Sequence, residues 1–535
     1  MRLLVATLAF LTAVRPSVAD EGQHHHDQLN QQQLGSVHFP VSCDAEVQKT
    51  FERGVALLHS FAFESAESTF RQIAQDDPHC AMAHWGIAMT FTRWGEPTPD
   101  QLKHGWEEIR IAKSLRPATA RERDYIEAET VFYRHPEKKD KKRDERRLKA
   151  LEKIYRSYPN DHEGAAWYAF ALMNSDRDDD PTHAARKQAA AILEPLFVIA
   201  PDHPGIAHYL IHIYDYPGMG ELGLAAAQRY AQIAPAAPHA LHMPSHIFAR
   251  LGMWDDDIAS NLASIAASRN SAMTHMGDEG HQYHAMEFLI YAYLQSGRDA
   301  DAQKLIEDVK ALPQMKSMYG IDQDPRTFAL VAYQASYVLE SHQWEQAVAL
   351  PLTQGTELGD DSITYLARAM GAAQLGRTEE ARQNVVKIAE LHEQVAAKKL
   401  PYANWVDDLR KEAEAWADRA EGKNEDAIKR LREQAAKEKD GMFAAQGSLP
   451  AHEMLADLLA EMNRSEEALV EYEAELKLNP NRFNSLYGAG RAAEAAKQPQ
   501  KAAAYYQQLT KSSAKNSQRS ELAHAHQFLS TVARN

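Results

Sequence analysis

The sequence predicts an all-α fold, in which antiparallel helix hairpins stack into a solenoid over residues 44–533. Amphipathic segments with helical periodicity alternate with short breaks along this range, and none has the period-two pattern of a strand. The breaks coincide with prolines, at Pro78, Pro117, Pro159, Pro201, Pro235 and Pro480. Similar residues also recur at fixed offsets in separate hairpins. These observations indicate a repeat protein rather than a string of unrelated domains.

The recurring offsets link a small residue to an alanine, an aromatic residue and a proline that follow it by 12, 16 and 24 positions. They occur at Gly54, Ala66, Phe70 and Pro78, and again at Ala456, Ala468, Tyr472 and Pro480. Small residues allow the two helices of a hairpin to approach closely, and the proline ends the second helix.

This pattern resembles the tetratricopeptide (TPR) repeat, a helix-turn-helix unit of about 34 residues. The resemblance is closest over 45–117 and 449–512 and good over 201–269, whereas 119–200 and 281–438 keep only the hairpin rhythm. It implies about twelve hairpins from 44 to 512, a final helix near 516–533 and a right-handed superhelix. It also implies a concave groove, lined by the first helix of each hairpin, in which a protein or peptide partner binds.

The N-terminus has the features of an export signal. Arg2 precedes an apolar stretch over 3–14, and Ser17 and Ala19 provide small residues for cleavage after position 19. We therefore expect a periplasmic or secreted protein. Since no later segment approaches 18 consecutive apolar residues, we expect no transmembrane segment.

The chain is accordingly divided into six parts: a signal peptide (1–19), a flexible His- and Gln-rich leader (20–43), N-terminal hairpins (44–200), His-rich hairpins (201–312), divergent hairpins (313–448), and C-terminal hairpins with a closing helix (449–533).

Composition excludes several classes of protein. With 44% hydrophobic and 25% charged residues, the chain is neither wholly disordered nor a membrane bundle. Its net charge of -16 argues against binding to a nucleic-acid backbone, which requires a basic surface.

The two cysteines, Cys43 and Cys80, are too far apart in sequence for a CxxC motif. They are either two buried thiols or one disulfide, and export favours the disulfide.

Histidines provide the strongest functional signal. His208 and His212 recur 34 residues later as His242 and His246, and each pair is spaced to lie on one helical face. The following hairpin contributes His281, His284 and Glu287, and Asp215 continues the face of His212. Neighbouring helices pack roughly 8–10 Å apart, so these side chains can meet between them.

We predict a metal site formed by His208, His212, His242 and His246, with His284 and Glu287 as further ligands and Asp215 as a ligand or as an acceptor for an imidazole. Zinc and copper fit a nitrogen-rich set without thiolate. Metal affinity is expected to fall as the pH drops through roughly 6.5. A structural or polar ligand-binding cluster is the alternative interpretation.

In the C-terminal hairpins, Glu453 and Asp457 share one face of a first helix. Tyr487 and Arg491 share one face of the first helix in the next hairpin. They are candidate partner-binding residues, and solvated surfaces are the alternative. No residue is assigned a catalytic role. The leading hypothesis is therefore an exported interaction scaffold, and the competing one is a metal carrier or metalloenzyme that uses the histidine cluster.

Overall fold

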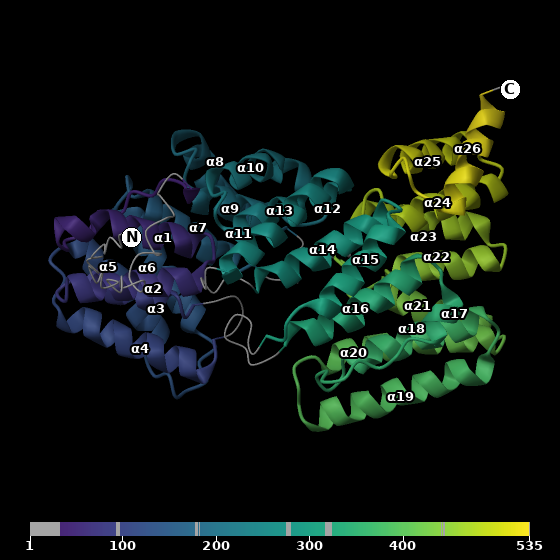
Figure 1. Cartoon of the computed structure of the whole chain (residues 1–535), viewed down its shortest axis with the longest axis horizontal. Coiled ribbons are helices and arrows are strands. Elements are labelled where there is room, and N and C mark those ends of the chain that lie inside the picture. Colours follow the sequence, from purple (N-terminus) through teal and green to yellow (C-terminus); the bar gives the residue numbers. More distant parts are fainter. Residues whose placement is uncertain are drawn as a thin grey trace, which may run out of the picture.

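The computed structural model describes residues 33–92, 97–176, 180, 182–273, 280–315, 324–439, 441 and 444–533. The signal peptide predicted for 1–19 and the histidine tract at 24–26 lie outside these residues. Within them the protein is helical and contains no strand, as predicted. Figure 1 shows the N-terminal helices at one end of the molecule, the C-terminal helices at the other, and α14 (His281–Gln295) between them.

The helices of the first half form six hairpins. Their bounds are α1 (Gln48–His59) with α2 (Phe63–Asp76), α3 (Ala81–Met89) with α4 (Pro99–Ser114), α5 (Ala120–Tyr133) with α6 (Arg143–Ser157), α7 (His162–Met173) with α8 (Ala184–Ile199), α9 (Pro204–Tyr214) with α10 (Gly220–Ile233), and α11 (Pro238–His242) and α12 (Pro244–Leu251) with α13 (Trp254–Met273).

The second half repeats this arrangement. The pairs are α14 with α15 (Asp299–Ala311), α16 (Pro325–Glu340) with α17 (Trp344–Val348), α18 (Asp361–Gln374) with α19 (Thr378–Ala397), α20 (Ala403–Ala420) with α21 (Asn424–Ala435), α22 (Ala451–Glu461) with α23 (Ser465–Leu478), and α24 (Phe483–Ala495) with α25 (Pro499–Ser512), and α26 (Ser520–Val532) closes the stack. The described helices thus give the predicted twelve hairpins and final helix.

The repeated aromatic residue fills the space between successive hairpins, as its offset predicts. A Cβ atom added to Gly54 would lie 2.7 Å from the Phe70 ring, and one added to Gly86 would lie 2.4 Å from it. Tyr472 occupies the same position against Gly488 in a late hairpin. A larger side chain at any of these three glycines would collide with the ring.

The solenoid is wound tightly enough for distant hairpins to touch. Helix α1 packs against α9, and α14 packs against α24. Two segments of the chain itself also lie against the first helices of the hairpins.

Residues 33–43 fill the concave face of the first hairpins. The Phe39 ring packs against Phe51 of α1, Trp85 of α3 and Tyr125 of α5, with ring centroids 4.9–5.4 Å apart. The Ser36 amide donates a hydrogen bond to the Asp202 carbonyl at 2.9 Å. The flexible leader predicted for 20–43 is therefore wrong for 33–43, because buried apolar side chains hold this part against the hairpins.

Residues 444–450 fill the corresponding face of the second half. The Ala445 amide donates to the Glu287 carbonyl on α14 at 3.2 Å, and the Gly447 amide donates to Ser336 Oγ on α16 at 2.9 Å. Since both stretches of groove are filled by the chain, the concave surface predicted to receive a partner is not open over these hairpins.

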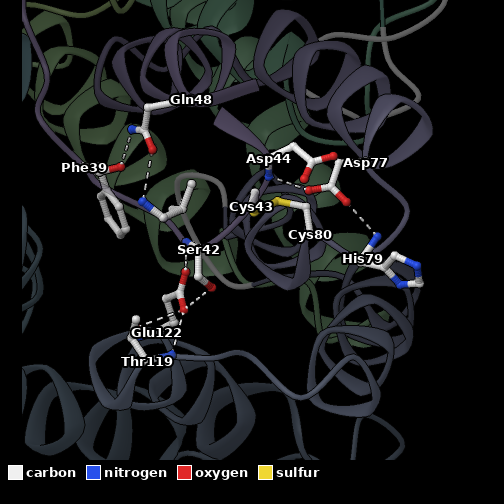
Figure 2. The surroundings of a disulfide bond; sticks show 11 residues. Phe39, Ser42, Cys43, Asp44, Gln48, Asp77, His79, Cys80, Thr119 and Glu122 are labelled. Carbon is white, nitrogen blue, oxygen red and sulfur yellow. Dashed lines mark hydrogen bonds between the residues drawn. A yellow bond between two sulfur atoms is a disulfide. The ribbon is translucent and has the colours of Figure 1, made fainter. Parts of the chain in front are cut away.

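The Cys43–Cys80 disulfide is present and joins the filling segment to the start of α3 (Figure 2). On one side of it the Asp44 amide donates to Asp77 at 2.8 Å, and on the other side Ser42 Oγ donates to Glu122 at 2.7 Å. Covalent and polar contacts therefore fix the end of residues 33–43 to two hairpins.

None of the helices in the described part of the chain combines the length and the apolar character needed to cross a membrane.

Candidate metal centre

Four helix segments bring the predicted histidines together. His208 and His212 lie one turn apart on α9. His242 ends α11 and His246 lies on α12, because Pro244 interrupts the helix between them. His284 lies on the first turn of α14.

The first group of imidazoles, triad A, consists of His208, His212 and His239, whose candidate ligand atoms all lie within 4.8 Å of one another. His208 Nε2 is 3.0 Å from His212 Nε2 and 3.1 Å from His239 Nε2. Two imidazole nitrogens bound to one ion through bonds of about 2.0–2.1 Å lie roughly 3.3 Å apart in tetrahedral geometry. Triad A is close to the geometry of a metal-bound set.

Triad B consists of His242, His246 and His284 and meets the same distance criterion. His242 Nε2 and His246 Nε2 are 3.0 Å apart. The prediction thus named five of the six triad histidines. The structure divides them into two groups rather than one, because the α9 pair meets His239 of α11, whereas His242 and His246 meet His284 of α14.

In three of these rings, the nitrogen Nδ1 donates a hydrogen bond to another part of the protein. His208 Nδ1 donates to the His59 carbonyl at 2.6 Å, His242 Nδ1 to Asn261 Oδ1 at 2.7 Å, and His246 Nδ1 to Asp215 Oδ2 at 2.8 Å. The Asn261 amide nitrogen donates to Asp257, which keeps the Asn261 oxygen directed at His242. Such contacts select the tautomer in which Nε2 carries the lone pair.

Burial keeps these imidazoles neutral. It lowers the pKa of His208 to about 3, and it lowers the pKa values of His212, His239 and His242, with neighbouring imidazoles adding to the effect. Burial also lowers the pKa of His246, against the opposing charge of Asp215. The expected loss of metal affinity near pH 6.5 is therefore displaced to lower pH, because protons compete weakly for these nitrogens.

Of the predicted carboxylates, neither Asp215 nor Glu287 joins a triad. Asp215 accepts from His246 and, at 2.7 Å, from Arg250 Nε, so it acts as the acceptor that orients His246. Burial opposes ionisation of Asp215, but Arg250 and His246 outweigh it and lower its pKa. Glu287 lies 3.4 Å from His284 Nδ1 at the partly exposed edge of the cluster.

Sequence reasoning missed His239 and did not assign His281 to the site. His239 has no counterpart in the 34-residue repeat, because Gly205 occupies the equivalent position. The spacing of three residues between His239 and His242 was the signal that sequence analysis could have used, because it places both rings on one helical face. The His281 ring lies 5.2 Å from that of His239, beside triad A.

A further buried group, His59, Glu163 and His203, was also missed, because its members come from three hairpins. Glu163 accepts from His59 Nε2 at 2.7 Å and from His203 Nε2 at 2.8 Å. His203 Nδ1 accepts the Ile206 amide, so its Nε2 carries the proton. This group is a hydrogen-bonded support behind the His59 carbonyl, since a protonated Nε2 has no lone pair for a metal.

The predicted partner-binding residues are divided between interior and surface. Glu453 is fully buried and pairs with Arg482 at 2.7 Å, and half-buried Asp457 accepts a hydrogen bond from Tyr472. Neither the partner-binding nor the solvated interpretation fits Glu453, because its side chain is enclosed, whereas the role of Asp457 stays a prediction. Arg491 is exposed and donates to Tyr487 at 3.4 Å, so this pair remains available at the surface.

The fold is an all-α stack of antiparallel helix hairpins, the arrangement that the TPR-like repeat pattern predicts. No protein-family model matches the sequence, and no curated protein matches it.

Solved structures that show similarity to this chain include the following three. The human IFIT1 dimer with m7Gppp-AAAA is 11% identical over 92% of this chain and 96% of that chain, with a TM-score of 0.35. The P58(IPK) TPR domain is 11% identical over 92% and 100%, with a TM-score of 0.20. APC/C Cut9-Hcn1 is 10% identical over 90% and 89%, with a TM-score of 0.24. The assignment of the fold rests on the hairpins themselves.

Proposed function

We propose that this protein uses its helical-repeat scaffold to hold two transition-metal ions, one at each histidine triad. The observation that carries the proposal is the pairing of His242 with His246. Both rings donate through Nδ1, to Asn261 and Asp215, so two neutral Nε2 lone pairs face each other across 3.0 Å. Two facing lone pairs repel each other, and a cation between them removes the repulsion.

The rest of the cluster supports the same function. Neutral imidazoles bind metal without first losing protons, and acceptors behind the rings fix their orientation. Imidazole sets suit zinc and copper, which remain the candidate ions. The filled concave groove favours metal binding over peptide recognition there. Metal carriage or metal-based catalysis is the activity that such a centre provides.

Elemental analysis of tag-free protein tests the proposal. The wild type is expected to bind two ions per chain, and a His208→Ala/His242→Ala variant is expected to lose both, because each change removes one ligand of a triad. His38→Ala is the matched control, since the His38 side chain is 88% exposed. Equal metal content in all three proteins, or none above background after metal is supplied, would contradict the proposal.

We further propose that the protein is exported and that cleavage follows position 19. The support is the N-terminal sequence together with the disulfide, which forms in oxidising compartments. Mass spectrometry of protein purified from an expressing cell is expected to find a chain that begins at position 20. An intact N-terminus in a reducing compartment would contradict this proposal.

A further inference from the structure

Each triad has one ring that is less buried than the other two. In triad B it is His284, whose side chain is 36% exposed, and in triad A it is His212, which is half-buried. The interior of the cluster is enclosed, since His208 is fully buried and His242 is 1% exposed. An ion from solvent therefore meets the cluster first at His284 or at His212.

The charged groups beside these two rings differ. The Glu287 carboxylate lies 3.4 Å from His284 Nδ1, and the Glu287 side chain is 25% exposed. Beside His212, the Arg186 guanidinium donates to the His212 carbonyl at 2.8 Å and is itself paired with Asp176. A partly exposed carboxylate attracts a cation, whereas a guanidinium paired with a carboxylate presents little net charge. Charge therefore favours the approach of a cation at His284.

Triad B has the supporting contacts needed to hold an arriving ion. Each of its three rings has an oxygen acceptor at Nδ1. These acceptors are Asn261 for His242, Asp215 for His246 and Glu287 for His284, at 2.7, 2.8 and 3.4 Å. Nε2 is then the nitrogen of each ring that binds an ion. Glu287 consequently has two roles, because it attracts the ion and orients the ring that the ion meets first.

A row of imidazoles connects triad B with triad A. Ring centroids are 4.5 Å apart between His284 and His242, 6.1 Å between His242 and His239, and 4.9 Å between His239 and His208. An ion that moves along this row exchanges one nitrogen ligand for the next. An ion that crossed apolar packing instead would lose all of its ligands at once, at a high cost in solvation free energy.

Aromatic rings and a buried carboxylate surround the inner end of this row. The Phe61 and Tyr230 rings pack against the His208 ring, with centroids 4.5 and 5.2 Å away. His208 Nδ1 donates to the His59 carbonyl, and His59 Nε2 donates to Glu163 at 2.7 Å. Burial opposes ionisation of Glu163, but the neighbouring imidazoles outweigh it and lower its pKa. The negative charge of Glu163 therefore favours a cation at triad A.

We propose, resting on the proposed function, that metal ions enter the centre through triad B and reach triad A from there. His284 and Glu287 form the entry. The two triads accordingly differ in role, because triad B exchanges ions with solvent or with a soluble chelate and triad A retains them. This order of filling goes beyond metal binding as such, since it assigns a route and a first contact to the ion.

The time course of metal uptake by metal-free protein tests the order of filling. The probe is zinc(II), transferred from a chromogenic chelator, and copper(I) is used in a parallel anaerobic experiment. The wild type is expected to take up one ion in a fast phase and a second in a slow phase. A His239→Gln variant should keep only the fast phase, because triad B remains complete. A His284→Gln variant should bind one ion, at triad A, more slowly than the wild type fills this triad.

A Glu287→Gln variant tests the carboxylate at the entry. Both triads keep their imidazoles in this variant, so two ions should still bind. Uptake should become about 10-fold slower at low ionic strength, and the difference from the wild type should shrink as salt is added. Glu127→Gln is the matched control, because the Glu127 side chain lies on α5 and is 54% exposed. Thermal melting confirms that each variant folds.

The outcomes separate the inference from the proposed function. If triad A fills at the wild-type rate in His284→Gln, the route through triad B is overturned, entry at His212 takes its place, and metal binding stands. Uptake by Glu287→Gln that matches the wild type at low ionic strength would overturn the entry role of Glu287. Failure of both zinc(II) and copper(I) to bind the wild type would overturn the inference and the proposed function together.

Discussion

The side chains behind the imidazoles explain why the histidines can serve as ligands. A histidine that packs in a core satisfies both nitrogens with protein partners. In triad B, Nδ1 of His242 donates to Asn261 and Nδ1 of His246 donates to Asp215, and the two Nε2 atoms lie 3.0 Å apart. The supporting residues Asp215 and Asn261 therefore determine the chemistry of the site as much as the imidazoles do.

Asp215→Asn should weaken metal binding at triad B. The carboxylate orients His246 and increases its basicity, and loss of such a contact typically lowers metal affinity about 10- to 100-fold. A competition titration with a metal chelator measures the change. Asp202→Asn is the control, because the Asp202 side chain is 70% exposed, and an equal effect of both substitutions would argue against a specific role for Asp215.

Acid should destabilise the metal-free protein. Burial lowers the pKa of His208 and of His281 to about 3 in the folded chain, whereas both titrate near 6.5 when unfolded. The unfolded state therefore binds more protons below about pH 6.5, and the free energy of unfolding falls as the pH drops from 6.5 toward 3.

Denaturant unfolding between pH 7 and pH 4 measures this dependence. A His208→Gln/His281→Gln variant should show a shallower decline than the wild type, because two of the groups that take up protons on unfolding are gone. A wild-type curve that stays flat below pH 6.5 would show that these imidazoles are not buried as neutral groups.

At the scale of the elements, residues 33–43 join the first hairpins to the histidine-bearing helices. The Gln33 carbonyl accepts the Ala236 amide just before α11, and Gly35 packs against Asp202 and Pro204 at the start of α9. At its other end this segment is fixed by the disulfide. Residues 33–43 and the disulfide thus hold in place the helices that position triad A.

Removal of the disulfide should lower stability by roughly 4 kcal/mol, because the bond closes a loop of 37 residues in the unfolded chain. Cys43→Ser/Cys80→Ser is compared with the oxidised wild type by denaturant unfolding. Reductant should destabilise the wild type and leave the double variant unchanged. Equal stability of the two oxidised proteins would contradict this contribution.

At the scale of the whole molecule, Arg482 joins hairpins that are distant in sequence. It is fully buried and pairs with Glu340 on α16 at 2.6 Å and with Glu453 on α22 at 2.7 Å, and it contacts the Tyr291 hydroxyl on α14 at 3.3 Å. Contact between α14 and α24 brings these groups together. Arg482 therefore maintains the tight winding of the second half.

Arg482→Leu should destabilise the protein by about 3–5 kcal/mol, because two buried carboxylates lose their counter-charge. Thermal and denaturant unfolding measure the loss. Arg491→Ala lies nine residues after Arg482, at an exposed position outside these contacts. This control substitution is expected to change stability by no more than about 0.5 kcal/mol. Similar losses in both variants would contradict the role of Arg482.

The sequence by itself determined the hairpin fold and the phase of the two histidine pairs, because both depend on short-range periodicity: His208 and His212 must share a face once α9 is a helix. Tertiary structure alone decided the rest. Packing of α1 against α9 brings the His59 carbonyl to His208, and packing of α11 and α12 against α14 brings His242 and His246 to His284. Burial of Glu453 removes it from the surface. These contacts join residues far apart in the chain, and local periodicity carries no information about how tightly the hairpins wind.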